Sequence, residues 1–391
     1  MNRWKRHIPE GVQDYLPGEY YNKRWVEEVI RKVFFYSGYD EIESPVFEYL
    51  DVFVGDKAYI KQEQMLKIVE AGSRILVMRP DVTMPIARIA ATKLRKAPLP
   101  IRLSYISDVY RYQEPWLGKQ RQIAQAGTEL IGLEGPEADA ETISTVIQCF
   151  LDLGLKDFQI DIGQVEFFKG LVDEAGLDSK SSEQLRLLIE QKNLLALESL
   201  LEEIPLKAEI KELFLNLPKM YGSIDILEKG ALYTGNNRCI KAIENIREVY
   251  EILKDYGLEK YITFDLGMIY SLNYYTGIIF RVFTKDLGFP LCGGGRYDKL
   301  LSEFGYDVPA TGFAIDIKRL LIALDRQGGL KTLPNTDILL VLDKKNRQEG
   351  YKLSDQLKKE GKRVEIFFST HNNKSPQEYA ESKGISEVIF L

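Results

Sequence analysis

The chain has 391 residues, of which 45% are hydrophobic and 28% are charged. At roughly 150 residues per domain, this length predicts two to three globular domains with well-buried cores. The composition excludes a disordered or fibrous chain, and the formal net charge of −6 excludes a global attraction to nucleic acid or to anionic membranes. The two histidines, His7 and His371, lie at opposite ends of the chain, which argues against a multi-histidine metal site and against histidine-based catalysis within one subunit.

Cysteine usage and the amino terminus indicate the compartment. Cys149, Cys239 and Cys292 are far apart and odd in number, a pattern typical of free thiols in a reducing environment. The basic amino terminus is not followed by an apolar segment of the kind that makes a secretory signal, and the longest apolar runs have the length of a strand. We therefore expect a cytoplasmic protein that does not associate with membranes.

The first part of the chain mixes helical and strand patterns without regular alternation. Apolar spacing predicts a helix over 19–36, a helix that begins near Thr83 and a helix over 137–153. Strand patterns occur at the following segments: 74–79, 101–112, 121–133 and 158–163. Because strands and helices do not alternate regularly, we expect an α+β fold with a largely antiparallel sheet flanked by helices.

The remainder of the chain predicts a helical insertion and a separate small domain. Residues 167–260 carry long helical patterns with almost no strand signal, so we interpret them as a helical insertion in a domain that spans 1–328. Strand patterns resume after residue 260, and a helix is expected from about 315 to 325. Residues 329–336 resemble a linker, and 329–391 predict a small α/β domain with a parallel three-stranded βαβαβ sheet.

Two groups of polar residues are candidates for a binding site. Arg79, Asp81 and Thr83 lie where a strand ends and a helix begins, so Asp81 either caps the helix or binds an ammonium group of a ligand. Arg111 lies at the end of a strand, and the next strand carries Gln125 and Glu129 on one face, with Arg121 before them. Convergence of these groups requires mutual ion pairs or a polar ligand. A solvated hairpin with ordinary ion pairs is the alternative.

Two further motifs have weaker interpretations. The glycine run Gly293–Gly295 lacks the spacing of a phosphate-binding loop and predicts either close approach of the backbone to a ligand or a tight turn. Tyr274 and Tyr275 form an aromatic pair that fits either a core or a pocket.

Taken in order, several segments resemble histidyl-tRNA synthetase, a class II aminoacyl-tRNA synthetase, over about residues 8–325. These segments are IPEGVQDYLP, GYDEIESPVFEY, RPDVT, VYRYQEPWLGKQRQIAQAGTELIG, LNYYTG, GGGRYDKLL and GFAIDIKRLL. The resemblance implies a class II synthetase-like domain at 1–328. It also implies that 329–391 is similar to the synthetase's anticodon-binding domain, truncated before its final elements.

Departures from the synthetase pattern concern the chemistry of amino-acid activation. Tyr270 stands where the synthetase has an arginine that stabilises developing charge, and Gln113 stands where it has an acidic residue beside the adenine. Loss of one such donor typically costs roughly 10²- to 10³-fold in rate. The family's third-motif arginine persists as Arg319, which leaves residual ATP binding open.

The residues that match the amino-acid-binding half of the synthetase site are retained, whereas the activation residues are altered. This combination resembles the regulatory subunit family of ATP phosphoribosyltransferase. This resemblance implies a non-catalytic chain, without a cofactor or a metal site, that forms a hetero-oligomer with the short catalytic phosphoribosyltransferase of histidine biosynthesis. It would activate that subunit and relay feedback inhibition by histidine. Self-association as a dimer through the first class II motif, around Ser44 to Phe47, is also implied, and tRNA binding is not expected.

The same resemblance implies roles for individual residues. Asp81 and Thr83 would bind the ammonium of histidine, Arg111 and Gln125 its carboxylate, and Glu129 and Tyr275 its imidazole. The inferred histidine-binding set comprises Asp81, Thr83, Arg111, Gln125, Glu129, Tyr274 and Tyr275. A subunit interface is an alternative location for histidine. The alternatives for the whole chain are a diverged histidyl-tRNA synthetase and a synthetase-like RNA-binding scaffold.

Overall fold

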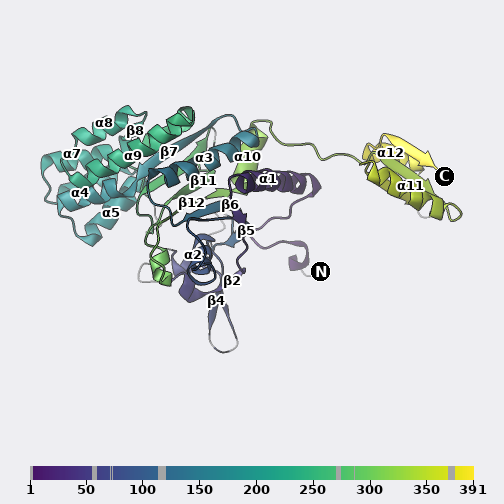
Figure 1. Ribbon diagram of the computed structural model, residues 1–391, viewed down its shortest axis with the longest axis horizontal. Helices are drawn as coiled ribbons and strands as arrows, with labels where there is room; N and C mark the ends of the chain where they lie inside the picture. The colour runs from purple at the N-terminus through teal and green to yellow at the C-terminus, as the bar shows by residue number, and fades with distance from the viewer. Residues whose placement is uncertain are drawn as a thin grey trace. The chain divides into compact units, whose positions relative to one another are not determined.

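The computed structural model describes residues 3–54, 60–70, 72, 74–112, 120–269, 274–285, 287–368 and 375–391. The chain divides into two units, Met1–Leu330 and Lys331–Leu391, which are coloured along the sequence in Figure 1. Gln113 and Tyr270, which mark the departures from the synthetase pattern, lie outside the described residues, as does His371.

A nine-stranded sheet forms the centre of the first unit, with the strand order β1-β5-β6-β12-β11-β10-β7-β9-β8. Its strands are β1 (Asp40–Glu41), β5 (Ile101–Tyr110), β6 (Gln122–Ile131), β7 (Phe158–Gln164), β8 (Tyr221–Gly222), β9 (Ile262–Asp265), β10 (Ile278–Thr284), β11 (Cys292–Arg296) and β12 (Ala310–Asp316). Only the β1–β5 and β7–β9 pairs are parallel among these described strands. The α+β class with a largely antiparallel sheet is therefore confirmed.

One face of the sheet is covered by amphipathic helices. The helices α1 (Pro17–Tyr36), α3 (Pro136–Asp152) and α10 (Ile317–Arg326) lie together along this face (Figure 1). Their apolar positions enter a core shared with alternate residues of the strands, such as Phe34 of α1 and Phe313 of β12, whose ring centroids are 5.8 Å apart. Burial of this stripe, at about 25 cal/mol per Å² of apolar surface, stabilises the layer.

The opposite face carries a different set of elements. The helix α2 (Thr83–Thr92) packs there, next to a small antiparallel sheet of β2 (Phe47–Tyr49), β4 (Ile75–Met78) and β3 (Lys67–Val69). The face of this small sheet exposes Phe47, Tyr49 and Ile68, at 51%, 46% and 40% of their surface. Short 3₁₀ turns occur at Arg3–Arg6, Leu50–Val52, Gln62–Gln64, Leu217–Lys219, Glu259–Tyr261 and Leu301–Phe304.

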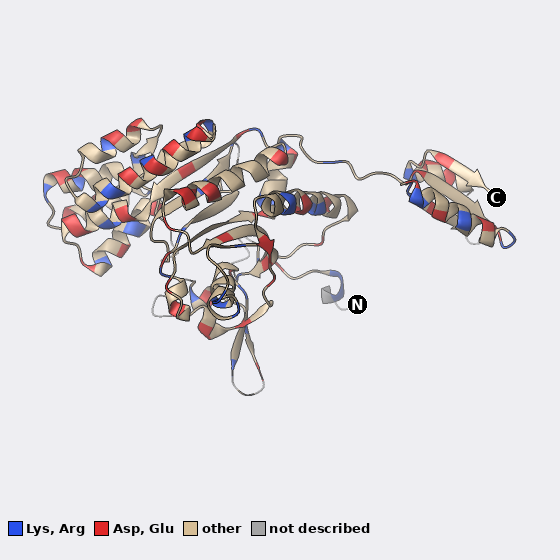
Figure 2. Cartoon of the chain, viewed as in Figure 1, with Lys and Arg blue, Asp and Glu red and all other residues tan. Residues whose placement is uncertain are grey.

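Six helices occupy the region where the sequence predicts a helical insertion. They are α4 (Val165–Ala175), α5 (Ser179–Glu190), α6 (Leu194–Glu203), α7 (Ala208–Asn216), α8 (Asp225–Leu232) and α9 (Asn237–Asp255). They gather at one end of the sheet, beyond β7 (Figure 1). Figure 2 shows both signs of charge interspersed along these helices, and Arg186 pairs with Glu183 at 2.7 Å, as is typical of surfaces that face solvent.

The second unit is a small parallel sheet with the order β14-β13-β15, built from β13 (Ile338–Leu342), α11 (Arg347–Lys359), β14 (Val364–Phe368), α12 (Pro376–Lys383) and β15 (Glu387–Phe390). The expected parallel three-stranded βαβαβ unit is confirmed. In the part of the chain that the structure describes, no helix combines the length and the apolar character needed to span a bilayer.

Candidate functional site

A cavity of about 210 Å³ opens on the face of the large sheet that carries α2. Its floor comes from β6, β11 and β12, and its walls come from the start of α2, the end of β5 and the segment before β10. All seven residues of the histidine-binding set expected from the sequence line it: Asp81, Thr83, Arg111, Gln125, Glu129, Tyr274 and Tyr275. The solvated-hairpin alternative is therefore wrong for Glu129, which is buried, and Gln125 lines the same cavity.

Glu129 lies at the buried end of the cavity, with 1% of its surface exposed. Its carboxyl group accepts hydrogen bonds from the Thr83 hydroxyl, at 2.7 Å, and from the Tyr297 hydroxyl. Burial raises the pKa of Glu129 to about 8, against the lowering effect of these two hydrogen bonds, and the nearby Asp81 raises it further. Glu129 is therefore mostly protonated at neutral pH in the unliganded chain.

Asp81 both bonds the first turn of α2 and lines the cavity. Its Oδ1 accepts a 3.1 Å hydrogen bond from the backbone N–H of Met84 in the first turn of α2, as a helix cap does. Its side chain also lines the cavity, and burial raises its pKa although Arg111 opposes this shift. The Arg111 guanidinium lies 4.0 Å from Asp81 Oδ2 and donates a 2.7 Å hydrogen bond to the Pro80 carbonyl.

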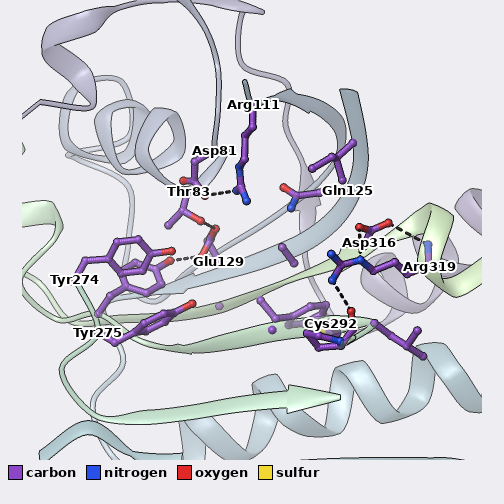
Figure 3. A pocket seen from close by; sticks show the side chains of 18 residues that line it. Asp81, Thr83, Arg111, Gln125, Glu129, Tyr274, Tyr275, Cys292, Asp316 and Arg319 are labelled. Carbon is purple, nitrogen blue, oxygen red and sulfur yellow. Dashed lines mark hydrogen bonds and ion pairs between the residues drawn. The ribbon is translucent and has the colours of Figure 1, made fainter. Parts of the chain in front are cut away.

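The two tyrosines before β10 form one wall of the cavity. Tyr274 and Tyr275 lie with ring centroids 4.7 Å apart, and Tyr274 packs edge-on against Tyr297. Figure 3 shows these rings beside Glu129, with Arg111 and Gln125 across the cavity. Aromatic faces next to a buried carboxyl group favour a flat ligand group that carries a positive charge.

Sequence reasoning missed several residues that line the cavity, and three of them adjoin Glu129 or Gln125. Tyr297 follows β11, whereas Gly312 and Asp316 lie on β12, directly opposite Glu129 and Gln125 of β6. A Cβ atom on Gly312 would lie 2.0 Å from Glu129 Oε2 and 2.4 Å from the Thr128 carbonyl oxygen, so only glycine leaves room for the carboxyl group. Alternation along 310–316 could have indicated a shared face, but the partner strand is not visible in sequence.

Other residues that the sequence singled out lie elsewhere. Arg121 stacks its guanidinium 5.1 Å from the ring centroid of Tyr112, and Arg79 bonds the carbonyl groups of Ser44 and Asp108. The glycine run forms the strand β11 and no tight turn, and Gly293 lines the cavity. Burial raises the pKa of Cys292, another lining residue, well above its usual value, which keeps the thiol protonated and poorly nucleophilic.

Metal binding has no support in the described part of the chain. No group of three or more His, Cys, Asp or Glu side chains there is arranged to hold a metal ion. The chemistry of the cavity is instead that of hydrogen bonds and ion pairs: three carboxyl groups, two arginines, an amide and a wall of phenol rings. This arrangement fits a small ligand with cationic groups at one end and a carboxylate at the other.

Comparisons with known proteins give the family. The histidyl-tRNA synthetase family model matches residues 11–320. The ATP phosphoribosyltransferase regulatory subunit of Acetivibrio thermocellus is 46% identical to the chain, over 100% of the chain and 93% of the relative. The chain belongs to the ATP phosphoribosyltransferase regulatory subunit family. The resemblance seen in the sequence is thereby confirmed, and the naming of these relatives supports a non-catalytic role.

Other members of this family and solved structures agree with this assignment. The regulatory subunit of Clostridium kluyveri is 42% identical, with 98% of the chain and 99% of the relative covered. A crystal structure from Bacillus halodurans, described as an ATP phosphoribosyltransferase regulatory subunit/histidyl-tRNA synthetase, superposes with a TM-score of 0.89 at 30% identity, over 98% of both chains. The histidyl-tRNA synthetase of Nostoc sp. PCC 7120, at 23% identity and a TM-score of 0.81 over 97% of this chain and 90% of the synthetase, shows the shared fold.

Proposed function

We propose that this chain is required for the activity of a short catalytic ATP phosphoribosyltransferase subunit and relays feedback inhibition by histidine, which binds in the cavity beside Glu129. The observation that carries the histidine part is the enclosure of Asp81 and Glu129 in one cavity whose only lining cations are Arg111 and Arg319, among the described residues. Burial of carboxyl groups is costly, and a ligand that brings positive charge relieves that cost.

The geometry supports one orientation of histidine. Its ammonium would approach Asp81, and its carboxylate would approach Arg111 and Gln125. Its imidazole would then lie between Tyr275 and Glu129. Charge-assisted hydrogen bonds of about 1.5 to 3 kcal/mol each would hold the two charged ends.

Protonation supports imidazole as the group beside Glu129. Free imidazole has a pKa of about 6.5, and burial holds the Glu129 pKa at about 8. At pH 7 the Glu129 carboxyl group therefore carries a proton, whereas the free imidazole does not. One shared proton completes the hydrogen bond between them, so binding at neutral pH requires no net uptake or release of protons.

Feedback inhibition then follows from linkage. Histidine must bind the inhibited assembly more tightly than the active assembly, and a coupling of about 1 to 3 kcal/mol corresponds to roughly 5- to 150-fold in affinity. The chain would contribute no group to the transferase reaction, whose substrates would bind the partner subunit. Its effect would pass through the interface between the two proteins.

Reconstitution tests this function. A short-form catalytic subunit is assayed alone, with this chain, and with this chain plus histidine. We expect activity to rise on addition of the chain and to fall as histidine is added. Activity that is independent of the chain would contradict the proposal, and histidine-dependent ATP–pyrophosphate exchange by the chain alone would favour a diverged synthetase instead. Tight, steeply salt-dependent tRNA binding without histidine binding would favour an RNA-binding scaffold.

We also propose that two copies of the chain associate through the small sheet of β2, β4 and β3. Phe47 and Tyr49 alternate on one face of β2, and Ile68 lies on the same face because it pairs with Leu76, the partner of Tyr49. Three neighbouring large hydrophobic residues that each expose 40% or more of their surface are typical of an interaction site. This surface directly follows Ser44, where the resemblance to class II synthetases implies dimerisation.

A further inference from the structure

The cavity contains a second ion pair at the end opposite Glu129. Asp316 is the last residue of β12 and the cap of α10, and its Oδ1 accepts a 3.0 Å hydrogen bond from the backbone N–H of Arg319. Its Oδ2 lies 3.1 Å from Arg319 Nε. Figure 3 shows this pair across the cavity from the tyrosine wall.

The Arg319 guanidinium makes two further contacts, with Pro290 and Phe289. Its Nη1 donates a 2.8 Å hydrogen bond to the carbonyl oxygen of Pro290, and its central carbon Cζ lies 4.9 Å from the ring centroid of Phe289. Both contacts fix the side chain in the position where it meets Asp316. The arginine therefore has an intramolecular anion, an acceptor and a stacking partner before any ligand enters.

Without Asp316, this end of the cavity would suit a phosphoryl group. The N-terminus of a helix supplies free backbone N–H groups and the positive end of the helix dipole, and an arginine adds a planar pair of donors. Asp316 takes up the same donors with its own carboxylate, since it binds both the backbone and the side chain of Arg319. An internal carboxylate occupies the place that an external anion would need.

The balance of charges that line the cavity also disfavours a phosphoryl group. The lining residues include three acids, Asp81, Glu129 and Asp316, and two arginines, Arg111 and Arg319. With Glu129 protonated, two carboxylates balance two guanidinium groups. A ligand with one positive and one negative end leaves this balance intact, whereas a triphosphate would bring several negative charges next to two carboxylates that line the cavity.

We propose that Asp316 is a specificity-determining residue that holds Arg319 in an internal ion pair, closes this end of the cavity to phosphoryl groups and leaves a site selective for a zwitterionic amino acid. The inference rests on the proposed function in one respect, that the Asp81 end is the amino-acid end. It accounts for Arg319 without a nucleotide, because the arginine serves the internal pair.

Capping of α10 is the simpler explanation of Asp316, and one substitution separates the two roles. Asn caps a helix about as well as Asp but carries no charge, so Asp316→Asn keeps the cap and removes the internal anion. Asp178→Asn is the matched control, because Asp178 caps α5 through the backbone N–H of Ser181 and does not line the cavity. Thermal unfolding shows whether the variants retain the fold.

The test is calorimetric titration with inorganic tripolyphosphate. We expect Asp316→Asn to bind tripolyphosphate about tenfold more tightly than the unchanged chain, with an affinity that falls as salt is added. Asp178→Asn should match the unchanged chain. The gain should disappear when Arg319→Ala is added to Asp316→Asn, since the phosphoryl group would have lost its guanidinium.

Two outcomes would overturn the inference: equal affinity in a folded Asp316→Asn variant and the unchanged chain, or a gain that survives Arg319→Ala. Titration of the unchanged chain with histidine separates this inference from the proposed function. If histidine does not bind while Asp316→Asn gains tripolyphosphate affinity that depends on Arg319, the histidine proposal fails and the role of Asp316 as an internal anion stands.

Discussion

The hydroxyl of Thr83 donates a 2.7 Å hydrogen bond to Oε1 of Glu129, which joins the first turn of α2 to the end of β6 across the cavity. This bond fixes one oxygen of the carboxyl group, and Tyr297 holds the other. Glu129 is therefore positioned before a ligand arrives, which reduces the entropy that binding costs.

Substitution of Glu129 should weaken histidine binding. Glu129→Gln keeps the shape of the side chain but removes the ionisable group that meets the imidazole, so we expect the Kd for histidine to rise about 10- to 100-fold in calorimetric titration. Glu27→Gln is the matched control, because Glu27 is equally buried but lies in α1, where it pairs with Lys23 and Arg24. An unchanged Kd in a folded Glu129→Gln variant would contradict the assignment of the pocket.

The affinity for histidine should be highest between about pH 6.5, the pKa of imidazole, and about pH 8, the pKa of Glu129. Below this window both groups carry a proton and one must be released on binding, and above it one must be taken up. Titrations at a series of pH values test this profile. In Glu129→Gln the affinity for histidine should still fall at acidic pH, but the fall at alkaline pH that ionisation of Glu129 causes should be absent. Identical pH profiles in the two proteins would refute the shared proton.

Glu129 should also make the unliganded chain less stable as the pH rises. Burial raises the folded-state pKa to about 8, whereas an unfolded chain releases this proton near pH 4.3. The contribution of Glu129 to the free energy of unfolding is therefore greatest below pH 4.3. Above that pH it falls by about 1.4 kcal/mol per pH unit, until the pH passes the folded-state pKa.

Urea unfolding at pH 5.5, 6.5 and 7.5 checks this dependence. The unchanged chain should lose stability more steeply with rising pH than Glu129→Gln. Asp139 and Asp265, whose pKa values burial raises to about 6, are common to both proteins, so the difference between the two slopes isolates Glu129. Parallel slopes would show that Glu129 is ionised in the folded chain.

Gly312 should tolerate no side chain. The Cβ of Gly312→Ala would meet Glu129 Oε2 and the Thr128 carbonyl oxygen, and relief of this overlap must displace β6 or the carboxyl group. We expect a loss of about 1 to 3 kcal/mol in the free energy of unfolding and weaker histidine binding. Gly235→Ala, where a Cβ meets no atom within 4 Å, is the control. Histidine binding equal to that of the unchanged chain would show that Glu129 can move freely.

A charge on the small sheet should separate the proposed dimer. Phe47→Glu places a carboxylate in the exposed apolar face, and burial of that charge against a second copy would be unfavourable. Sedimentation velocity should then show monomers where the unchanged chain shows dimers. Leu195→Glu is the control, since Leu195 is 78% exposed near the start of α6, in the helical insertion. Dimers that persist in Phe47→Glu would place the interface elsewhere.

The sequence by itself determined much of the local structure. The 3.6-residue spacing of apolar side chains located α1 and α3 to within a few residues, and alternation placed Gln125 and Glu129 on one face of β6. These patterns are local, because each reflects how a single helix or strand presents one face to a core. The order of the motifs further indicated the family, and with it seven of the residues that line the cavity.

Only the tertiary structure decided which segments share the site. Pairing of β12 with β6 places Gly312 opposite Glu129 and Asp316 opposite Gln125. Tyr297, which follows β11, donates a hydrogen bond to the Glu129 carboxyl group. Strand order and register depend on the assembly of the whole sheet, since hydrogen bonds between strands join residues far apart in the chain. The sequence left residual ATP binding at Arg319 open. The structure places this arginine against the carboxylate of Asp316, three residues earlier in the chain, and against the carbonyl of the distant Pro290.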